Sequence, residues 1–239
     1  MDSAAISFQA AQAFRNQVSG YFHYFHFGLS GYADRLLIRI RKRVCETFVA
    51  EFSPGAKDTI LDIGISNDDH IAANYLEKTY PHPQSIVALG LEPYPELKAV
   101  FPALTLVCGD GRALPFADNS FDFVYSHAVI EHAGSRTSQA RFVAEAYRVC
   151  RKGVLLTTPN RWHPIETHVG LPFLHYLPAP VFRRLCRALG KPMYAREETL
   201  NLLSAAELRR LAGTRRAQFR SMRWLGMPSN LVLILRKTT

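Results

Sequence analysis

The sequence predicts an α/β fold in which a mostly parallel, doubly wound sheet is covered by helices on both faces. Short apolar runs alternate with helix-like segments between about residues 59 and 158. The first run ends abruptly in a polar turn, and two further strand-like runs close the chain. Parallel strands that are buried on both faces need such apolar runs, and right-handed crossovers then fix the winding.

Residues 1–55 are expected to form a helical extension ahead of the sheet. From Asp34 to Phe52, apolar residues recur every three or four positions and basic residues take the other side, which is typical of an amphipathic helix packed on a core. The aromatic run at 21–27, YFHYFHF, is interpreted as an apolar flap. A wall over a hydrophobic substrate or a membrane surface is the alternative interpretation.

The sheet domain is expected to span residues 56–239. The pattern predicts strands at about 59–64, 86–91, 104–108, 121–126 and 153–158, and helices at about 69–79, 95–100 and 137–149. A capping box at Ser204 and Glu207 predicts a further helix that ends at Gly213. The runs QFRSMRWL and LVLILRK then predict an antiparallel hairpin, joined at 226–230, which brings the sheet to seven strands.

Residues 160–200 interrupt this alternation with several prolines and short apolar pieces such as LPFLHYL. A connection of this length and apolar character is not expected to be an idle linker. We therefore interpret it as a lid insertion.

The composition limits the classes of partner. Lys and Arg number 29 against 20 Asp and Glu, for a formal charge of +9, which permits anionic partners. No apolar run reaches the roughly 18 residues of a membrane span, and no basic segment followed by an apolar one marks a secretory leader at the start. We expect a cytoplasmic protein without a transmembrane segment, with peripheral membrane contact left open. Its oligomeric state cannot be deduced from the sequence.

Polar residues follow four of the predicted strands. The carboxyl ends of parallel strands meet at one edge of a sheet, which is where α/β folds bind nucleotides. From the first strand to the fourth, these residues are Asp62, Gly64 and Ser66, then Glu92, then Asp110 and Gly111, and finally the loop Ser126-His127-Ala128-Val129-Ile130-Glu131-His132.

In their order and placement these motifs resemble those of the class I S-adenosylmethionine-dependent methyltransferases, closest to the small-molecule group that includes ubiquinone-type methyltransferases. The resemblance covers residues 57–160 well and the closing hairpin loosely. It implies a Rossmann-like sheet, S-adenosyl-L-methionine as the methyl donor, and a small-molecule or lipid-like acceptor. Of the family pattern Asp-x-Gly-x-Gly-x-Gly, Asp62 and Gly64 match, whereas Ser66 and Asp68 stand where later glycines belong.

The resemblance also implies a role for each motif in binding the donor. The first loop would run under the methionine part and the ribose, Glu92 would accept both ribose hydroxyls, and the Asp110-Gly111 turn would bind adenine. Ser126 opens the loop where the transferable methyl group should lie.

The candidate catalytic residues are His127, Glu131 and His132. Positioning supplies most of the acceleration in methyl transfer, and a base is needed only when the acceptor carries a proton. Histidine suits that task because its ordinary pKa lies near 6.5. Hydrogen bonds that merely hold the loop are the alternative role.

Other functions stay open at this point. The departures at Ser66 and Asp68 suggest a methyltransferase-like scaffold that has lost turnover, and the basic charge suggests RNA methylation, although the interleaved aromatic and basic pattern of RNA readers is missing. No metal site is expected. His163, Glu166 and His168 have a metal-like spacing, but Pro164 argues against a zinc-binding helix.

Overall fold

The computed structural model describes residues 30–67, 72–166, 168–169 and 171–237 of the chain. Seven strands form one sheet: β1 (Ile60–Ile63), β2 (Ile86–Gly90), β3 (Thr105–Cys108), β4 (Phe121–His127), β5 (Cys150–Pro159), β6 (Ala217–Trp224) and β7 (Met227–Arg236). Their order across the sheet is β3-β2-β1-β4-β5-β7-β6. Strands β1 to β5 run parallel, and β7 is antiparallel to both of its neighbours. The predicted fold class is therefore confirmed.

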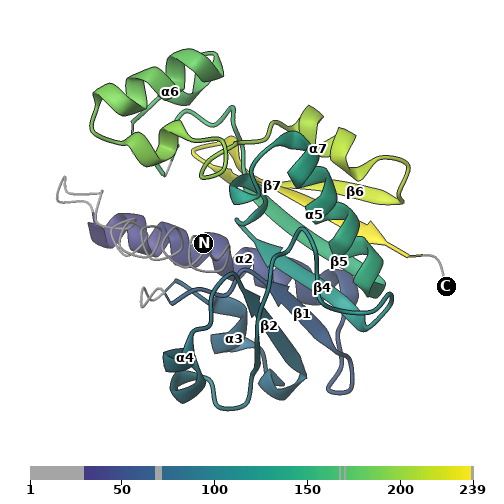
Figure 1. Ribbon diagram of the computed structural model, residues 1–239. Coiled ribbons are helices and arrows are strands. Elements are labelled where there is room, and N and C mark those ends of the chain that lie inside the picture. Colours follow the sequence, from purple (N-terminus) through teal and green to yellow (C-terminus); the bar gives the residue numbers. More distant parts are fainter. Residues whose placement is uncertain (1–29, 68–71, 167, 170, 238–239) are drawn as a thin grey trace, which may run out of the picture.

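Helices lie on both faces of the sheet (Figure 1). They are α2 (Ser30–Phe52), α3 (Tyr75–Thr79), α4 (Pro95–Val100), α5 (Arg136–Val149), α6 (Ala179–Ala188) and α7 (Ala205–Ala212), with short 3₁₀ turns at Pro83–Ser85, Ile130–His132, Leu174–Tyr176 and Pro192–Ala195. Ser204 and Glu207 form the predicted capping box of α7, and Gly213 ends that helix.

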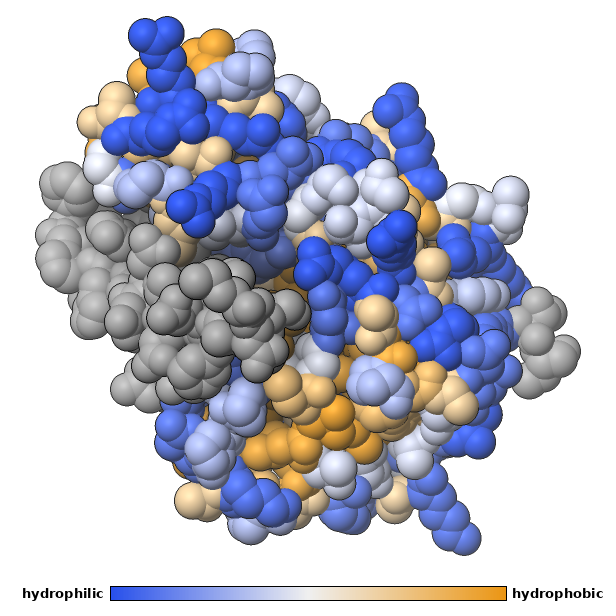
Figure 2. Space-filling model, in the orientation of Figure 1, coloured by the Kyte–Doolittle hydropathy of each residue, from blue (hydrophilic) through white to orange (hydrophobic). Residues whose placement is uncertain are grey.

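Each face of the sheet has its own apolar core, because successive strand residues point to opposite sides. One core joins α2, α3 and α4 to Ile60, Phe123 and Tyr125, among others. The other joins α5 and α7 to Leu61, Val124 and further residues. No helix lies between β3 and β4, and Figure 2 shows an apolar patch near β2 and this connection.

The carboxyl-terminal half of α2 anchors that helix to the sheet. The Phe52 ring stacks on that of Phe123, with centroids 5.1 Å apart. The ring also covers Gly153, where a Cβ atom would come within 2.2 Å of a Phe52 ring carbon. The amino-terminal half of α2 runs on past the sheet toward the side where α6 lies (Figure 1). The aromatic run at 21–27 lies outside the described residues.

The predicted insertion at 160–200 has a small core of its own. Its buried apolar side chains include those of Phe182, Cys186 and Tyr194, and in Figure 1 its helix α6 stands apart from the sheet. The two ends of the insertion meet, because Asn160 and Leu203 form a parallel bridge. No helix of the described chain is both long enough and apolar enough to cross a bilayer.

Two predicted boundaries were wrong. Within the predicted helix at 69–79 the described helix begins only at Tyr75, because Asn74 has a left-handed backbone with φ 48°. The closing hairpin turns at Leu225 and Gly226, with φ 50° and 76°, and 227–230 already belong to β7. A two-residue turn with positive φ at both positions matches the twist of the paired strands.

Candidate functional site

The loops after β1 and β4 meet at the point where the strand order reverses, since β1 pairs with β2 on one side and with β4 on the other. Ligands of open α/β sheets bind at such switch points. Gly64 leaves β1 with φ 122°, and its N–H donates to the Leu89 carbonyl over 2.8 Å. A Cβ atom at Gly64 would lie 2.2 Å from Val129 Cγ2. Both its backbone conformation and this close approach therefore require glycine.

Asn74 holds the first loop in place. Its amide nitrogen donates to the Ser66 carbonyl over 2.8 Å, and its amide oxygen accepts from the Ser66 N–H over 3.2 Å. This pair of hydrogen bonds fixes the backbone where the usual pattern has a second glycine. Asp68 lies outside the described residues. The motif did not predict this role, because Asn74 lies eight residues beyond Ser66.

Asp62 lies in the core rather than at the edge of the sheet. Its side chain is only 7% exposed, and it faces Glu77 of α3. Burial raises the pKa of Asp62 well above its ordinary value, and the negative charge of Glu77 and a hydrogen bond with it raise the pKa further. The carboxyl group thus joins β1 to α3 from inside.

The loops after β2 and β3 are tied to each other. The Gly109 N–H donates to the Gly90 carbonyl over 2.8 Å, and Glu92 follows β2 as a half-buried residue. A Cβ atom at Gly90 would lie 2.9 Å from the Ile65 carbonyl oxygen, so the β2 loop also touches the first loop. The structure therefore brings the first three predicted loops together.

Asp110 is paired with Arg112 two residues on. The guanidinium Nη2 lies 2.6 Å from Asp110 Oδ2, and the Arg112 N–H donates to Oδ1 over 2.8 Å. Burial alone would raise the pKa of Asp110, but the hydrogen bonds and charge of Arg112 outweigh it and lower that pKa. Gly111 between them is buried, and a Cβ there would meet the Phe142 ring at 2.5 Å. The turn is therefore closely packed against α5.

The strand β4 ends in a constrained loop. Ser126 is buried and donates through Oγ to the Ile63 carbonyl over 2.8 Å, which ties β4 to β1. His127 Nδ1 lies 2.7 Å from Thr157 Oγ1. Burial and the nearby charge of Arg41 lower the pKa of His127 well below its ordinary value. Ala128 has φ 56°, and such a backbone in a non-glycine residue is strained.

Glu131 and His132 turn toward the insertion, where they meet His168. Glu131 is 0% exposed, and burial raises its pKa to about 7 although the charge of His168 opposes this. Burial and the charge of His168 lower the pKa of His132 to about 4. His168 itself pairs with Glu166 over 2.5 Å. Burial alone would lower the pKa of His168, but the charge and hydrogen bond of Glu166 and the charge of Glu131 together outweigh it and raise that pKa above its ordinary value.

Three residues absent from the predicted site connect the β4 loop to the end of the insertion. The Gln139 amide, fully buried in α5, donates to the Ile130 and Asn201 carbonyls over 3.0 and 2.8 Å. The Asn201 side chain donates to the Gly134 carbonyl over 2.8 Å, and Arg136 donates to Asn201 and Leu202 carbonyls over 3.3 and 2.8 Å. The capping region of α5 could have suggested Arg136 and Gln139; nothing in the sequence indicates Asn201.

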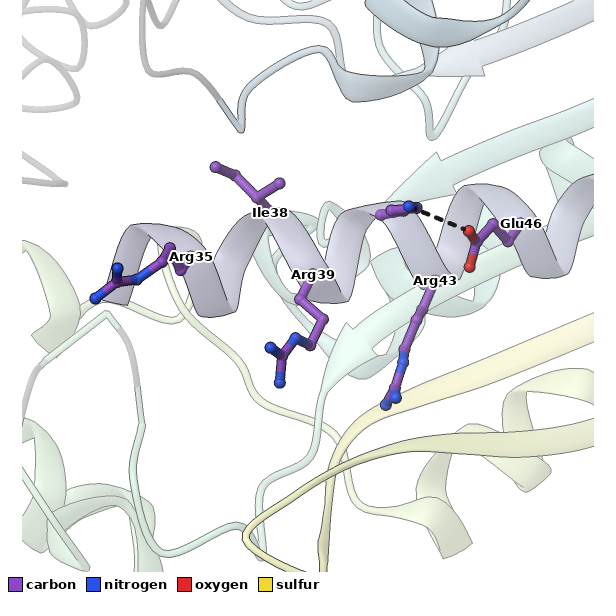
Figure 3. A pocket seen from close by; sticks show the side chains of 6 residues that line it. Arg35, Ile38, Arg39, Arg43 and Glu46 are labelled. Atoms are coloured by element: carbon purple, nitrogen blue, oxygen red, sulfur yellow. Dashed lines mark ion pairs between the residues drawn. The ribbon is translucent and has the colours of Figure 1, made fainter. Parts of the chain in front are cut away.

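A surface groove runs along α2 and is separate from these loops. Figure 3 shows Arg35, Arg39 and Arg43 on one side of the helix and Ile38 on the opposite side. The groove is lined by Arg35, Ile38, Arg39, Lys42, Arg43 and Glu46. The Glu46 carboxylate pairs with Lys42 Nζ over 3.9 Å. None of the loop residues described above lines it.

Part of the chain is similar to known methyltransferases. Residues 61–158 match the family described as a methyltransferase domain. A segment of 67 residues is 40% identical to a protein of Mycolicibacterium smegmatis named "Probable S-adenosylmethionine-dependent methyltransferase". That match spans 27% of this chain and only 25% of the length of that relative.

Two solved structures have the same fold. One is the 1,6-didemethyltoxoflavin-N1-methyltransferase of Burkholderia thailandensis, with 1,6-didemethyltoxoflavin and S-adenosylhomocysteine bound; it is 16% identical, with a TM-score of 0.57 over 97% of this chain and 89% of that one. The other is a SAM-dependent methyltransferase of Aquifex aeolicus, 16% identical, with a TM-score of 0.50 over 80% and 88%.

Proposed function

We propose that this chain is a class I S-adenosylmethionine-dependent methyltransferase, with its catalytic domain at the residues that match a methyltransferase domain, 61–158, and that it moves a methyl group from S-adenosylmethionine to a small organic acceptor. One observation carries the proposal. The four predicted loops converge at the switch point of the sheet, where Gly64 leaves the backbone exposed beside the loop after β4. The finer placement, in the ubiquinone-type group, is part of the same proposal.

We assign binding of the methyl donor to residues that follow the carboxyl ends of β2 and β3. Glu92 is the acceptor for the ribose hydroxyls, since it is half-buried at the end of β2 and next to the first loop. Asp110 retains acceptor capacity beside Arg112 for the adenine amine. Asp62 and Ser126 act by holding the β1 and β4 loops, because the structure engages both side chains inside the fold.

The insertion supplies the acceptor side in this proposal. Trp162 and Phe173 are 54% and 58% exposed, and both rings contact that of Tyr176, with centroids 5.4 and 5.6 Å apart. Exposed aromatic side chains that gather in this way suit a flat apolar partner. They support an aromatic or lipid-like small molecule as the acceptor.

Methyl transfer requires the protein mainly to place the donor and the acceptor. Methyl transfer is an in-line displacement at the sulfonium carbon, and holding donor and acceptor in line supplies most of the acceleration. When the acceptor carries a proton, His127 is the residue we assign to receive it. Its low pKa keeps the imidazole neutral, and Thr157 orients the ring through Nδ1.

Calorimetric titration with S-adenosylmethionine and S-adenosylhomocysteine tests the donor side. We expect both to bind the folded chain, and Glu92→Ala to weaken binding at least tenfold because two ribose hydroxyls lose their acceptor. Glu96→Ala, an exposed acid in α4, is the matched control and should bind as the wild type does. Folded protein that binds neither ligand would refute the proposed function.

A measurement of methyl transfer distinguishes an active methyltransferase from a scaffold protein that has lost turnover. Transfer of labelled methyl groups into apolar extracts should be seen with the wild type. His127→Asn should lower kcat while leaving donor affinity unchanged, because Asn can keep the hydrogen bond to Thr157 but cannot accept a proton. Tight donor binding without any labelled product would favour the scaffold instead.

A further inference from the structure

We infer that Glu131, His132 and His168 bind one divalent transition-metal ion, which joins the loop after β4 to the insertion. Glu131 and His132 are neighbours in the turn after β4 and His168 lies in the insertion, and the structure brings one ligand atom from each of the three to within 4.8 Å of the others. The inference does not depend on the methyl donor.

The spacing of the three atoms is close to that of a metal site. Glu131 Oε1 and His132 Nε2 are 4.0 Å apart, and the His132 and His168 ring centroids are 5.0 Å apart. Ligand atoms around a tetrahedral zinc ion with bonds of about 2.0–2.1 Å lie about 3.3 Å apart. Side-chain rotations that draw the ligand atoms together by up to about 1.5 Å would therefore complete the geometry.

Each imidazole makes its hydrogen bond through Nδ1, which leaves Nε2 to act as the metal ligand. His132 Nδ1 lies 2.6 Å from the Thr199 carbonyl oxygen. A carbonyl can only accept, so Nδ1 carries the proton and Nε2 keeps its lone pair. His168 Nδ1 donates in the same way to the Glu166 carboxylate over 2.5 Å. Metal-binding histidines are oriented by such carbonyl and carboxylate partners.

The carboxylate of Glu131 supplies a third, independent observation. One oxygen, Oε2, accepts from Thr158 Oγ1 over 3.0 Å, but Oε1 is buried and has no hydrogen-bond partner among the described residues. A buried carboxylate oxygen without a partner is costly. A cation held between Oε1 and the two Nε2 atoms would remove that cost.

The chemistry of the three proposed ligands determines which class of ion the site would bind. Two imidazoles and one carboxylate suit zinc and neighbouring transition metals, whereas magnesium and calcium prefer oxygen ligands. Three protein ligands also leave a fourth position open, as in catalytic zinc sites. The ion would connect the turn Ile130–His132 directly to the insertion.

The test uses the full chain, stripped with a chelator and dialysed. Calorimetry should show one Zn²⁺ bound per chain and no Mg²⁺ bound, and metal analysis should return the same stoichiometry. His132→Asn and His168→Asn should each weaken Zn²⁺ binding at least tenfold. Asparagine can keep the hydrogen bond made by Nδ1 but lacks an atom in place of Nε2, so both variants are expected to fold.

Two further variants sharpen the test. His82→Asn, which changes a half-buried histidine outside the cluster, should bind Zn²⁺ as the wild type does. Glu166→Gln should weaken binding about 10–100-fold, since Glu166 orients a ligand without touching the ion.

A folded wild type that binds no Zn²⁺, or cluster variants that bind it as tightly as the wild type, would overturn the inference. S-adenosylmethionine binding, measured on the same samples, keeps the two proposals apart. Intact donor binding with no metal binding overturns the metal site alone.

Discussion

Gly64 is the residue at which two loops of the candidate site touch, so its replacement should be costly. Gly64→Ala is expected to lower the free energy of unfolding by two contributions of about 1–3 kcal/mol each, one from the positive φ and one from overpacking against Val129. Urea unfolding measures the sum.

The matched control is Gly190→Ala, since Gly190 also has a positive φ, 71°, but nothing lies within 4 Å of its added Cβ. This variant should show only the backbone contribution. Truncating Val129 to Ala in the Gly64→Ala protein should recover part of the loss. Equal losses at the two glycines would show that the contact with Val129 is unimportant.

Asp62 should make stability depend on pH in the direction that its buried position dictates. Its pKa is raised in the folded protein, so its contribution is complete below the pKa of the unfolded chain and is lost as pH rises through the folded pKa. Asp62→Asn titrates no proton, so the stability of this variant relative to the wild type should increase with pH. Urea unfolding at pH 5 and pH 8 measures the trend.

Asp110→Asn gives the opposite trend. The pKa of Asp110 is lowered by Arg112, so its contribution is present above the unfolded pKa and is lost as pH falls through the folded one. The variant should lose stability relative to the wild type between low and neutral pH. Parallel trends for Asp62→Asn and Asp110→Asn would contradict this account of the two carboxyl groups.

At the residue scale, the sequence predicted where the site residues lie in the sheet better than it predicted which groups surround them. Gly64, Glu92 and Asp110 lie at the edge of the sheet where the strand pattern put them. The pattern did not predict that Asp62 would face Glu77 inside the core, or that Asn74 would hold the first loop. Both involve the start of α3, which follows the left-handed backbone of Asn74. Asparagine tolerates that conformation, but the presence of an asparagine does not by itself predict it.

At the scale of elements, Gln139 connects α5, the β4 loop and the end of the insertion. Gln139→Leu should lower the free energy of unfolding by about 1–3 kcal/mol, because the Ile130 and Asn201 carbonyls each lose the hydrogen bond from the buried Gln139 amide. Hydrogen exchange should also become faster at residues 196–203, which measures the loosened insertion directly.

Gln84→Leu, at an exposed position in the turn before β2, is the control and should change neither quantity. Loss of stability without faster exchange at 196–203 would mean that Gln139 supports the core but does not hold the insertion.

The elements themselves were predicted unevenly. Strands β1 to β5 were recognised because apolar runs of strand length alternate with helical periodicity, and α7 because its capping box is local in sequence. The hairpin was placed too late because Leu225 adopts a positive φ that leucine rarely shows. The small core of the insertion was not predicted, since its apolar residues follow no single period.

At the scale of the whole molecule, the packing of α2 decides whether residues 1–55 include a separate unit. Phe48 is fully buried against the sheet, so Phe48→Ala should lower the free energy of unfolding by about 3–5 kcal/mol. Unfolding should remain one transition when followed by circular dichroism and by tryptophan fluorescence.

Val49→Ala, one residue on and 42% exposed, should cost about 0.5 kcal/mol. Two transitions, of which Phe48→Ala shifts only one, would show that α2 unfolds apart from the sheet and would support the predicted boundary at residue 55.

The order of the strands was accessible from the sequence because right-handed crossovers leave few alternatives. The meeting of His132 with His168 was not, since it depends on the path of an insertion without regular structure. The sequence pattern instead grouped His163, Glu166 and His168. The structure separates His163, which stacks on Trp224 with centroids 5.1 Å apart, from the other two.

The bridge between Asn160 and Leu203 has a consequence for how such a protein can change over evolution. A connection whose two ends lie side by side can be lengthened, shortened or exchanged with little effect on the strands that it leaves and re-enters. The sheet and its loops then stay constant, and the segment between the two residues can be replaced as a unit. Selection can change which molecules such a protein recognises by altering that segment alone, while the rest of the fold is inherited unchanged.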